Sequence, residues 1–191
     1  MNFIDLFAGA GGLSEGFVRE GFHPVAHLEM DKNACDTLKT RLAHHYLIKN
    51  DQLNIYNAYL KNEISRDILW SKIPESILES VINEEISAKT IKSLFHRIDK
   101  QLQGEKVDLI IGGPPCQAYS LVGRSRDPNR MKEDKRNFLF RYYAEFLRRY
   151  NPKFFVFENV LGLLTAGNKK YLTEMIQLFE SISQIPSTRF P

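Results

Sequence analysis

The chain has 191 residues, of which 43% are hydrophobic and 26% charged, and its formal net charge is +3. These values are typical of a globular domain with a core of its own and exclude an intrinsically disordered chain. No apolar run approaches the roughly 20 residues that span a bilayer, and the N-terminus lacks the basic region of a signal peptide. Two cysteines cannot form a disulfide framework, so we expect a cytoplasmic protein.

The first fifty residues predict alternating strands and helices. Residues 2–7 predict a buried strand that ends in a glycine-rich run, and a helix over 13–20 follows, closed by Gly21. Residues 22–28 predict a second strand and residues 32–43 a second helix. A weaker strand pattern over 44–49 would add a third strand to the sheet.

The segment from about residue 50 to 104 has a different pattern. Its apolar residues recur at spacings of three and four, which is typical of amphipathic helices with a core-facing stripe. We interpret it as a helical insertion into the sheet-building pattern.

Strand character returns over residues 106–111 and again, as a buried strand, over 153–157. Helices are predicted over 134–150 and 169–183. The alternation predicts an α/β fold with a doubly wound, mostly parallel sheet, in which ligands bind outside the carboxyl ends of the strands. Candidate functional groups follow four strand ends and therefore predict a single site.

The glycine-rich run is Phe7-Ala8-Gly9-Ala10-Gly11-Gly12. Ser14 stands where a dinucleotide-binding loop requires its third glycine, and the lysine of a phosphate-binding loop is missing. The run favours a ligand with one carboxylate, such as the methionyl end of S-adenosylmethionine, although a plain tight turn stays open. Glu29, after the second strand, suits a pair of ribose hydroxyls, with a surface acid as the alternative.

Cys116 lies in the run Gly112-Gly113-Pro114-Pro115-Cys116-Gln117, just after a predicted strand. The segment 124–136 that follows holds six basic and three acidic residues, and positive surroundings favour the nucleophilic thiolate. Cys35, within a predicted helix, is expected to be a buried structural thiol. Glu158-Asn159 follows an apolar strand, where desolvation would raise the pKa of the carboxyl group and make it a proton donor; an ordinary turn residue is the alternative.

Three motifs, in this chain order, resemble those of the DNA cytosine-C5 methyltransferases. They are the glycine-rich run over residues 7–12, the run Gly113-Pro114-Pro115-Cys116-Gln117, and Glu158-Asn159-Val160. The resemblance implies a Rossmann-like S-adenosylmethionine-dependent methyltransferase fold, with S-adenosylhomocysteine as the product and no metal. Cys116 would attack C6 of a cytosine flipped out of double-stranded DNA, and Glu158 would hydrogen-bond its N3 and amino group. The basic loop would contact DNA phosphates through Ser120, Arg124 and Arg126.

The resemblance also implies a set of cofactor-binding residues. Phe7 and Met30 would lie against the adenine, Glu29 would hold the ribose, and the glycine loop would surround the methionyl part. An acid that contacts the adenine amino group is assigned to Asp67, with Asp51 as the second choice. The implied set is Phe7, Ala8, Gly9, Gly11, Gly12, Glu29, Met30, Asp67, Pro114 and Leu139.

The family pattern continues beyond Glu158-Asn159-Val160 with a Gln-x-Arg-x-Arg segment and a target-recognition domain, neither of which this sequence contains. We therefore expect residues 1–191 to be a partial catalytic domain, whose sheet is incomplete at the C-terminus and which is inactive alone. The whole enzyme would belong to a restriction–modification system with a cognate endonuclease. A tRNA cytosine-5 methyltransferase and a non-catalytic S-adenosylmethionine-binding fragment stay open, whereas Ser14 disfavours a dinucleotide oxidoreductase. The sequence predicts neither the DNA target nor the oligomeric state.

Overall fold

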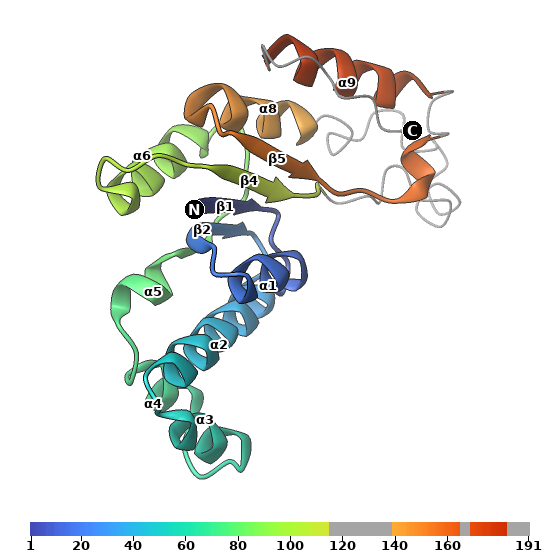
Figure 1. Cartoon of the computed structure of the whole chain (residues 1–191). Helices are drawn as coiled ribbons and strands as arrows, with labels where there is room; N and C mark the ends of the chain where they lie inside the picture. Colours follow the sequence, from blue (N-terminus) through green and yellow to red (C-terminus); the bar gives the residue numbers. More distant parts are fainter. Residues whose placement is uncertain (115–138, 165–168, 183–191) are drawn as a thin grey trace.

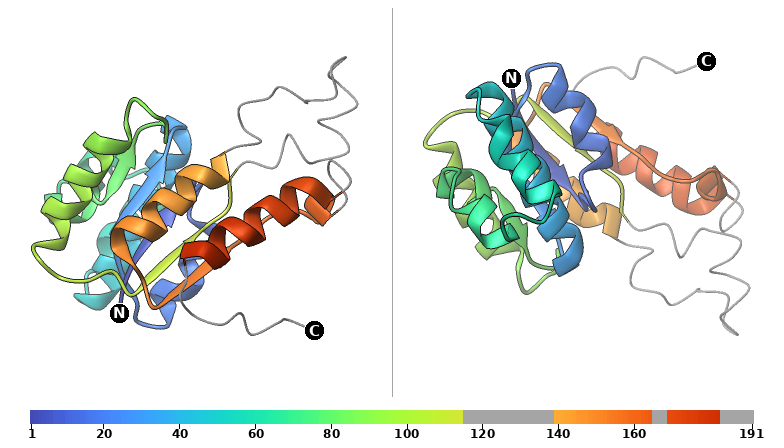
Figure 2. Two further views of the ribbon diagram at one scale, coloured as in Figure 1. Left: turned by 90° about the horizontal axis from the view of Figure 1, so that it is seen from above. Right: turned by 90° about the horizontal axis from the view of Figure 1, so that it is seen from below.

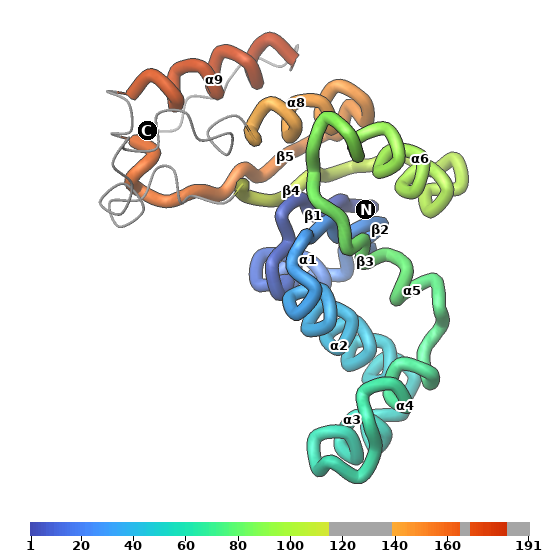
Figure 3. The backbone as a smooth tube through the Cα atoms, turned by 180° about the vertical axis from the view of Figure 1, so that it is seen from behind, coloured from blue at the N-terminus to red at the C-terminus, as the bar shows by residue number. Residues whose placement is uncertain are grey.

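The fold is built on a parallel sheet of five strands in the order β3-β2-β1-β4-β5 (Figure 1; β3 is labelled in Figure 3). The computed structural model describes residues 1–114, 139–164 and 169–182. The strands are β1 (Asn2–Leu6), β2 (His23–Glu29), β3 (Val81–Asn83), β4 (Leu109–Gly112) and β5 (Phe154–Phe157). All four strand pairs are parallel, and the chain winds outward from β1 in both directions. The doubly wound α/β class predicted from the sequence is thereby confirmed.

Helices cover both faces of the sheet, as the two views in Figure 2 show. On one face lie α1 (Gly12–Arg19) and α2 (Lys32–Lys49), and on the other lie α6 (Ile91–Leu102) and α8 (Leu139–Tyr150). The last helix, α9 (Lys170–Ile182), packs on α8. No helix in the described ranges has both the length and the apolar character needed to cross a bilayer.

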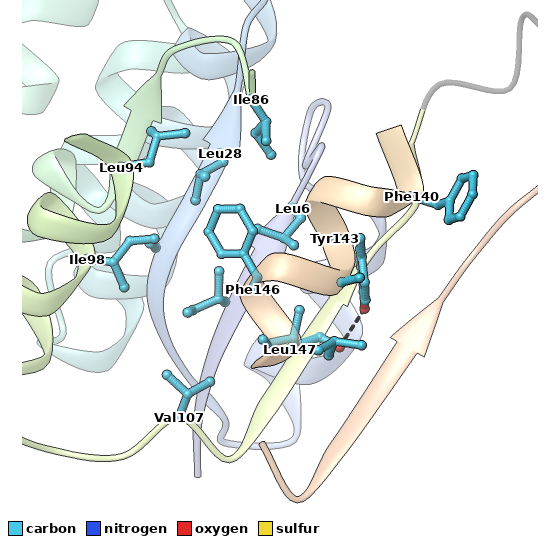
Figure 4. Close-up of a cluster of buried hydrophobic side chains, with 14 of the residues drawn as sticks. Leu6, Leu28, Ile86, Leu94, Ile98, Val107, Phe140, Tyr143, Phe146 and Leu147 are labelled. Carbon is cyan, nitrogen blue, oxygen red and sulfur yellow. Dashed lines mark hydrogen bonds between the residues drawn. The ribbon is translucent and has the colours of Figure 1, made fainter. Parts of the chain in front are cut away.

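The main core lies between the sheet and the helices α6 and α8. Leu6 of β1 and Leu28 of β2 are fully buried, and Figure 4 shows them close to Leu94 of α6 and Phe146 of α8. Because successive strand residues point to opposite faces, Phe3 of β1 packs instead with the apolar side of α1. Apolar side chains are therefore buried on both faces of the sheet. They hold the strands in fixed positions, and with them the strand ends that carry the candidate site.

Tyr143 joins α8 to the two strands that carry Gly112 and Phe157. Its hydroxyl lies 3.0 Å from the carbonyl oxygen of Ile110 and 3.1 Å from that of Val156, and its one proton is shared between these two acceptors. Burial raises the pKa of Tyr143 well above its ordinary value, so the side chain remains a neutral donor.

The predicted third strand over residues 44–49 is wrong, because α2 continues through Lys49. Ala43 and Leu47, four residues apart, lie on one face of α2 and pack with Leu69 and Ile73 of the following segment. The same apolar residues that suggested a strand therefore form the second half of a long helical stripe.

The predicted helical insertion over 50–104 is only partly right. It contains α3 (Leu53–Leu60), α4 (Arg66–Trp70), α5 (Glu75–Glu79) and α6, but it also contains the edge strand β3 (Figure 3). In the sequence, Val81 and Ile82 share the three- and four-residue spacing of Ile77 and Leu78, so a strand of three residues is hidden in a helical pattern.

The predicted burial of β5 is also wrong. Within the described residues, Phe154 is 66% exposed and Phe155 and Val156 are each 38% exposed, because β5 has β4 as its single neighbouring strand and a helix on one face. On that face Phe155 and Phe157 contact the ring of Phe179 from α9. The chain leaves β5 through Glu158 into a short 3-10 helix, η3 (Leu161–Leu164).

Candidate active site

The carboxyl ends of the strands bring the predicted motifs to one edge of the sheet. In the register of the sheet, Leu6 at the end of β1 lies opposite Leu28 of β2 and Gly112 of β4, and Gly112 lies opposite Phe157 of β5. The glycine-rich run, Glu29, Gly113 and Glu158 come directly after these positions. The four groups therefore surround the same edge, as the alternation of strands and helices predicted.

The glycine-rich run is a tight turn from β1 into α1. Phe7, Gly9 and Gly11 have left-handed φ angles of 58°, 55° and 81°. The Ala8 N–H donates to the Leu28 carbonyl at 3.0 Å, and the Gly11 N–H donates to the Ala8 carbonyl at 2.9 Å. The turn is thus fixed to the end of β2 by backbone hydrogen bonds.

The glycines of this turn have different roles. A methyl group at Gly11 would lie 2.5 Å from the Leu38 side chain, so Gly11 allows the turn to pack against α2. A methyl group at Gly9 or Gly12 would meet no atom within 4 Å. Gly9 and Gly12 therefore leave open space beside the backbone for a ligand, whereas Gly11 is required by packing.

Glu29 connects the glycine turn with the start of α2. Its carboxylate accepts a hydrogen bond from the Gly9 N–H through Oε2 and another from the Asp31 N–H through Oε1, both at 2.8 Å. Asp31 in turn caps α2, because its side chain accepts from the Ala34 N–H at 2.8 Å. The next residue, Met30, is 67% exposed and offers an apolar surface beside this carboxylate.

Asn83, at the end of β3, was not found by the sequence analysis. Its side-chain amide donates to the carbonyl oxygens of Glu29, at 3.1 Å, and Met30, at 2.9 Å. The Glu84 N–H also donates to the Glu29 carbonyl, at 3.0 Å. Asn83 therefore fixes the backbone that presents Glu29, and it was missed because β3 itself was missed.

Cys35 has the structural role that was predicted for it. It is 1% exposed, and its thiol donates to the Glu29 carbonyl with a sulfur–oxygen distance of 3.4 Å. Burial and the nearby Glu29 carboxylate raise the pKa of the thiol to about 11, so Cys35 stays protonated and unreactive.

Gly113 and Glu158 are in direct contact. A methyl group at Gly113 would overlap the carbonyl oxygen of Glu158 and lie 2.7 Å from its Oε2. The Glu158 N–H donates to the Gly112 carbonyl at 3.0 Å, and the Asn159 side chain donates to the Pro114 carbonyl at 3.4 Å. The Gly-Pro-Pro-Cys and Glu-Asn motifs are thus joined before the chain reaches Cys116.

Glu158 differs from the prediction in one respect. Its side chain is exposed rather than desolvated, because β5 lies at the edge of the sheet with one face uncovered in the described part of the chain. The preceding apolar run Phe154–Phe157 suggested burial that an edge strand does not provide.

Four predicted residues, Cys116, Ser120, Arg124 and Arg126, lie outside the described residues. Pro114, the last described residue before them, is buried. Leu139, at the start of α8, is half-buried next to the buried Phe140.

Asp67 and Asp51 do not reach this edge. Asp67 is exposed on α4, whose buried Leu69 packs beside the second half of α2, and Asp51 follows the C-terminal end of α2. The assignment came from the family resemblance, in a segment where the inserted helices separate the motifs. The acids that do follow the real third strand are Glu84 and Glu85.

Comparison with known proteins agrees with this arrangement. The family model described as C-5 cytosine-specific DNA methylase matches residues 1–74 and 56–183. The chain belongs to this family. The type II methyltransferase M.Bpa9945I of Bacillus paralicheniformis is 42% identical over 95% of this chain and 45% of its own length. M1.HphI of Haemophilus parahaemolyticus is 31% identical over 95% of this chain and 38% of its own length.

A solved structure shares the fold of this methylase-family chain. The crystal structure of a protein named as a DNA modification methyltransferase, encoded within a prophage of E. coli, superposes with a TM-score of 0.58 and 25% identity. The match covers 95% of this chain and 38% of that one. The chain thus spans less than half the length of the relatives it matches.

Proposed function

We propose that this chain supplies the cofactor-binding and catalytic part of an enzyme that methylates C5 of cytosine in double-stranded DNA. The observation that carries the proposal is the contact between Gly113 and Glu158 on the same sheet edge as the glycine turn and Glu29. Membership of the DNA methylase family supports the reaction class, and the type II relatives support a role in a restriction–modification system with a cognate endonuclease. Its DNA substrate favours the cytoplasm as its compartment.

The residues at the ends of β1 and β2 fit S-adenosylmethionine. Open space beside Gly9 and Gly12 suits the methionyl part, and the Glu29 carboxylate suits the ribose hydroxyls. Phe7 and the exposed Met30 supply apolar surface for the adenine. When bound there, S-adenosylmethionine supplies an electrophilic methyl group, and S-adenosylhomocysteine is the product.

Cys116 and Glu158 are proposed to activate the cytosine. C5 is a poor nucleophile until the Cys116 thiolate forms a bond to C6, which turns the ring into an enamine. Glu158 forms hydrogen bonds with N3 and the amino group, so it stabilises the charge that develops on the ring. After C5 has gained the methyl group, a base takes the C5 proton and the sulfur–C6 bond breaks, which restores the aromatic ring and the Cys116 thiolate.

The target cytosine must leave the helix to reach these groups, because C5 and C6 are inaccessible to a thiolate within a stacked duplex. Ser120, Arg124 and Arg126 are proposed to contact the phosphates around the flipped nucleotide. Such contacts position the DNA without selecting its sequence.

A chimeric enzyme tests the proposed function. Residues 1–183 replace the matching first part of the B. paralicheniformis methyltransferase, and transfer of tritiated methyl groups from S-adenosylmethionine to duplex DNA is measured. We expect label on cytosine C5. Cys116→Ser should give no label, and Glu158→Gln should lower the rate of methyl transfer by at least about 100-fold. A chimera that binds S-adenosylmethionine but labels only RNA, another base atom or nothing would overturn the proposal.

A further inference from the structure

A polar pocket lies between α1, α2, α3 and α4, outside the candidate active site. Its volume is about 460 Å³, within the roughly 300–1,000 Å³ that is typical of small-molecule sites. None of the site residues discussed above lines it. The pocket exists because α3 and α4 pack along α2, as Figure 3 shows.

Arginine side chains are the main charged groups of this pocket. Arg19, Arg41 and Arg66 line it, facing two carboxylates, Glu15 and Asp36. Glu15 pairs with Arg19 at 2.8 Å and with Arg41 at 3.2 Å, and Asp36 pairs with Arg66 at 3.1 Å. Three guanidinium groups against two carboxylates leave an excess of positive charge.

The carboxylates orient the arginines without using all their donors. Glu15 also accepts a hydrogen bond from His45 at 2.9 Å, and His45 and Arg19 together lower the pKa of Glu15 to about 2. The low pKa indicates positive surroundings. Because a guanidinium has five N–H donors and Arg41 directs only one nitrogen at Glu15, donors remain for an anion in the pocket.

One wall of the pocket is aromatic. The rings of His44 and Tyr56 lie 4.5 Å apart, and that of Tyr59 lies 6.0 Å from Tyr56. Within the described part of the chain, the His44 nitrogens and the two tyrosine hydroxyls have no hydrogen-bond partner. Burial and the neighbouring His45 lower the pKa of His44, so this ring is neutral and can lie against a planar group.

We propose that this pocket binds the phosphate group of a nucleotide, with Arg41 and Arg66 contacting the phosphate and Tyr56 beside the base. Guanidinium groups and planar rings line the same pocket, and they match the phosphate and the base of such a ligand. The phosphate could be that of a free mononucleotide or that of the DNA backbone. Asp36 lies about one turn into α2, which starts at the active-site edge, so both sources can reach the pocket.

Isothermal titration of the 191-residue chain, saturated with S-adenosylmethionine, tests this proposal. The probes are AMP, dCMP, inorganic phosphate and a short DNA duplex. We expect one AMP or dCMP per chain, with a dissociation constant at least tenfold higher for Arg41→Ala and Arg66→Ala. The matched control is Arg148→Ala on α8, because Arg148 is 45% exposed and Arg41 is 43% exposed. The control should bind like the wild type.

Two further arms identify the source of the phosphate. Tyr56→Leu should weaken mononucleotide binding but leave inorganic phosphate unchanged, which supports a free nucleotide. If the duplex binds and the mononucleotides do not, and if this binding is lost in Arg41→Ala but kept in Arg148→Ala, the DNA backbone is the source of the phosphate. If no probe binds in a way that depends on Arg41 or Arg66, while near-ultraviolet circular dichroism shows folded variants, the proposal is overturned. The S-adenosylmethionine in this assay keeps the probes out of the proposed cofactor site, and methyl transfer is not measured. Loss of methyl transfer in the chimera and loss of Arg41-dependent probe binding are therefore separate results.

Discussion

At the scale of single residues, the candidate cofactor site depends on how Glu29 is held. Its two carboxylate oxygens accept from Gly9 and Asp31, and its carbonyl accepts from Asn83. The side chain that would bind a ribose is thus fixed before a ligand arrives, and such preorganisation lowers the entropic cost of binding.

Asn83→Asp tests the contribution of the β3 end to this arrangement. The substitution keeps the size of the side chain but sets an oxygen against the Glu29 and Met30 carbonyl oxygens, where an N–H group now donates. We expect the dissociation constant for S-adenosylmethionine, measured by titration calorimetry, to rise about tenfold. Asn57→Asp, on the exposed surface of α3, is the matched control. Equal affinity in both variants would show that Asn83 does not position the site.

Glu15→Gln should reveal a pH-dependent contribution to stability. The folded-state pKa of Glu15 is lowered from 4.5 to about 2, chiefly by His45, so its stabilising effect is complete above pH 4.5 and is lost as the pH falls toward 2. Urea unfolding at neutral pH should show that the free energy of unfolding of the variant is lower by about 1 kcal/mol. The expected loss is this small because solvent screens the partners Arg19 and Arg41. That difference should shrink between pH 4.5 and 3, and a constant difference would contradict the assignment.

At the scale of elements, the pairing of β4 with β5 brings two motifs together. Gly113→Ala would place a methyl group against Glu158 and displace it from the edge. In the chimera we expect methyl transfer to fall by about 100-fold while S-adenosylmethionine binding changes less than twofold. Gly16→Ala, on α1 with open space around it, should leave both unchanged. Full activity in Gly113→Ala would show that Glu158 does not need its present position.

Tyr143→Phe tests the connection of α8 to the same two strands. Loss of the hydroxyl leaves the Ile110 and Val156 carbonyl oxygens without this buried donor. We expect the free energy of unfolding in urea to fall by about 1–2 kcal/mol. Tyr46→Phe, on α2, removes a half-buried hydroxyl and should change stability by less than about 0.5 kcal/mol. Equal losses in the two variants would remove the special role of Tyr143.

Elements that glycines delimit could be predicted from the sequence, whereas a strand of three residues and the exposure of the last strand could not. The boundaries of α1 and β2 differ from the predicted ones by one residue at each end, because a glycine turn and Gly21 delimit them. The strand β3 has three residues and an apolar spacing that also fits a helix. The exposure of Phe154 depends on which strand ends the sheet, and local sequence does not contain that information.

At the scale of the whole molecule, one topological rule explains why the predicted motifs lie at the same edge of the sheet. Parallel strands with helical crossovers place their carboxyl ends at one edge, so motifs separated by about 150 residues, from Gly9 to Glu158, could be assigned to one site. Asp67 lies away from this edge, because α4 packs beside the second half of α2.

The central claim is that Cys116 forms a covalent bond to cytosine at this edge, and intact-protein mass spectrometry tests it most directly. The chimera and S-adenosylmethionine are incubated with a duplex that contains 5-fluorocytosine, whose C5 fluorine prevents the elimination that would release the thiol. We expect a stable adduct of protein, DNA strand and one methyl group, which peptide mapping places on Cys116 and which Cys116→Ser abolishes. An adduct that persists in Cys116→Ser, or methylated DNA without any covalent species, would contradict the account.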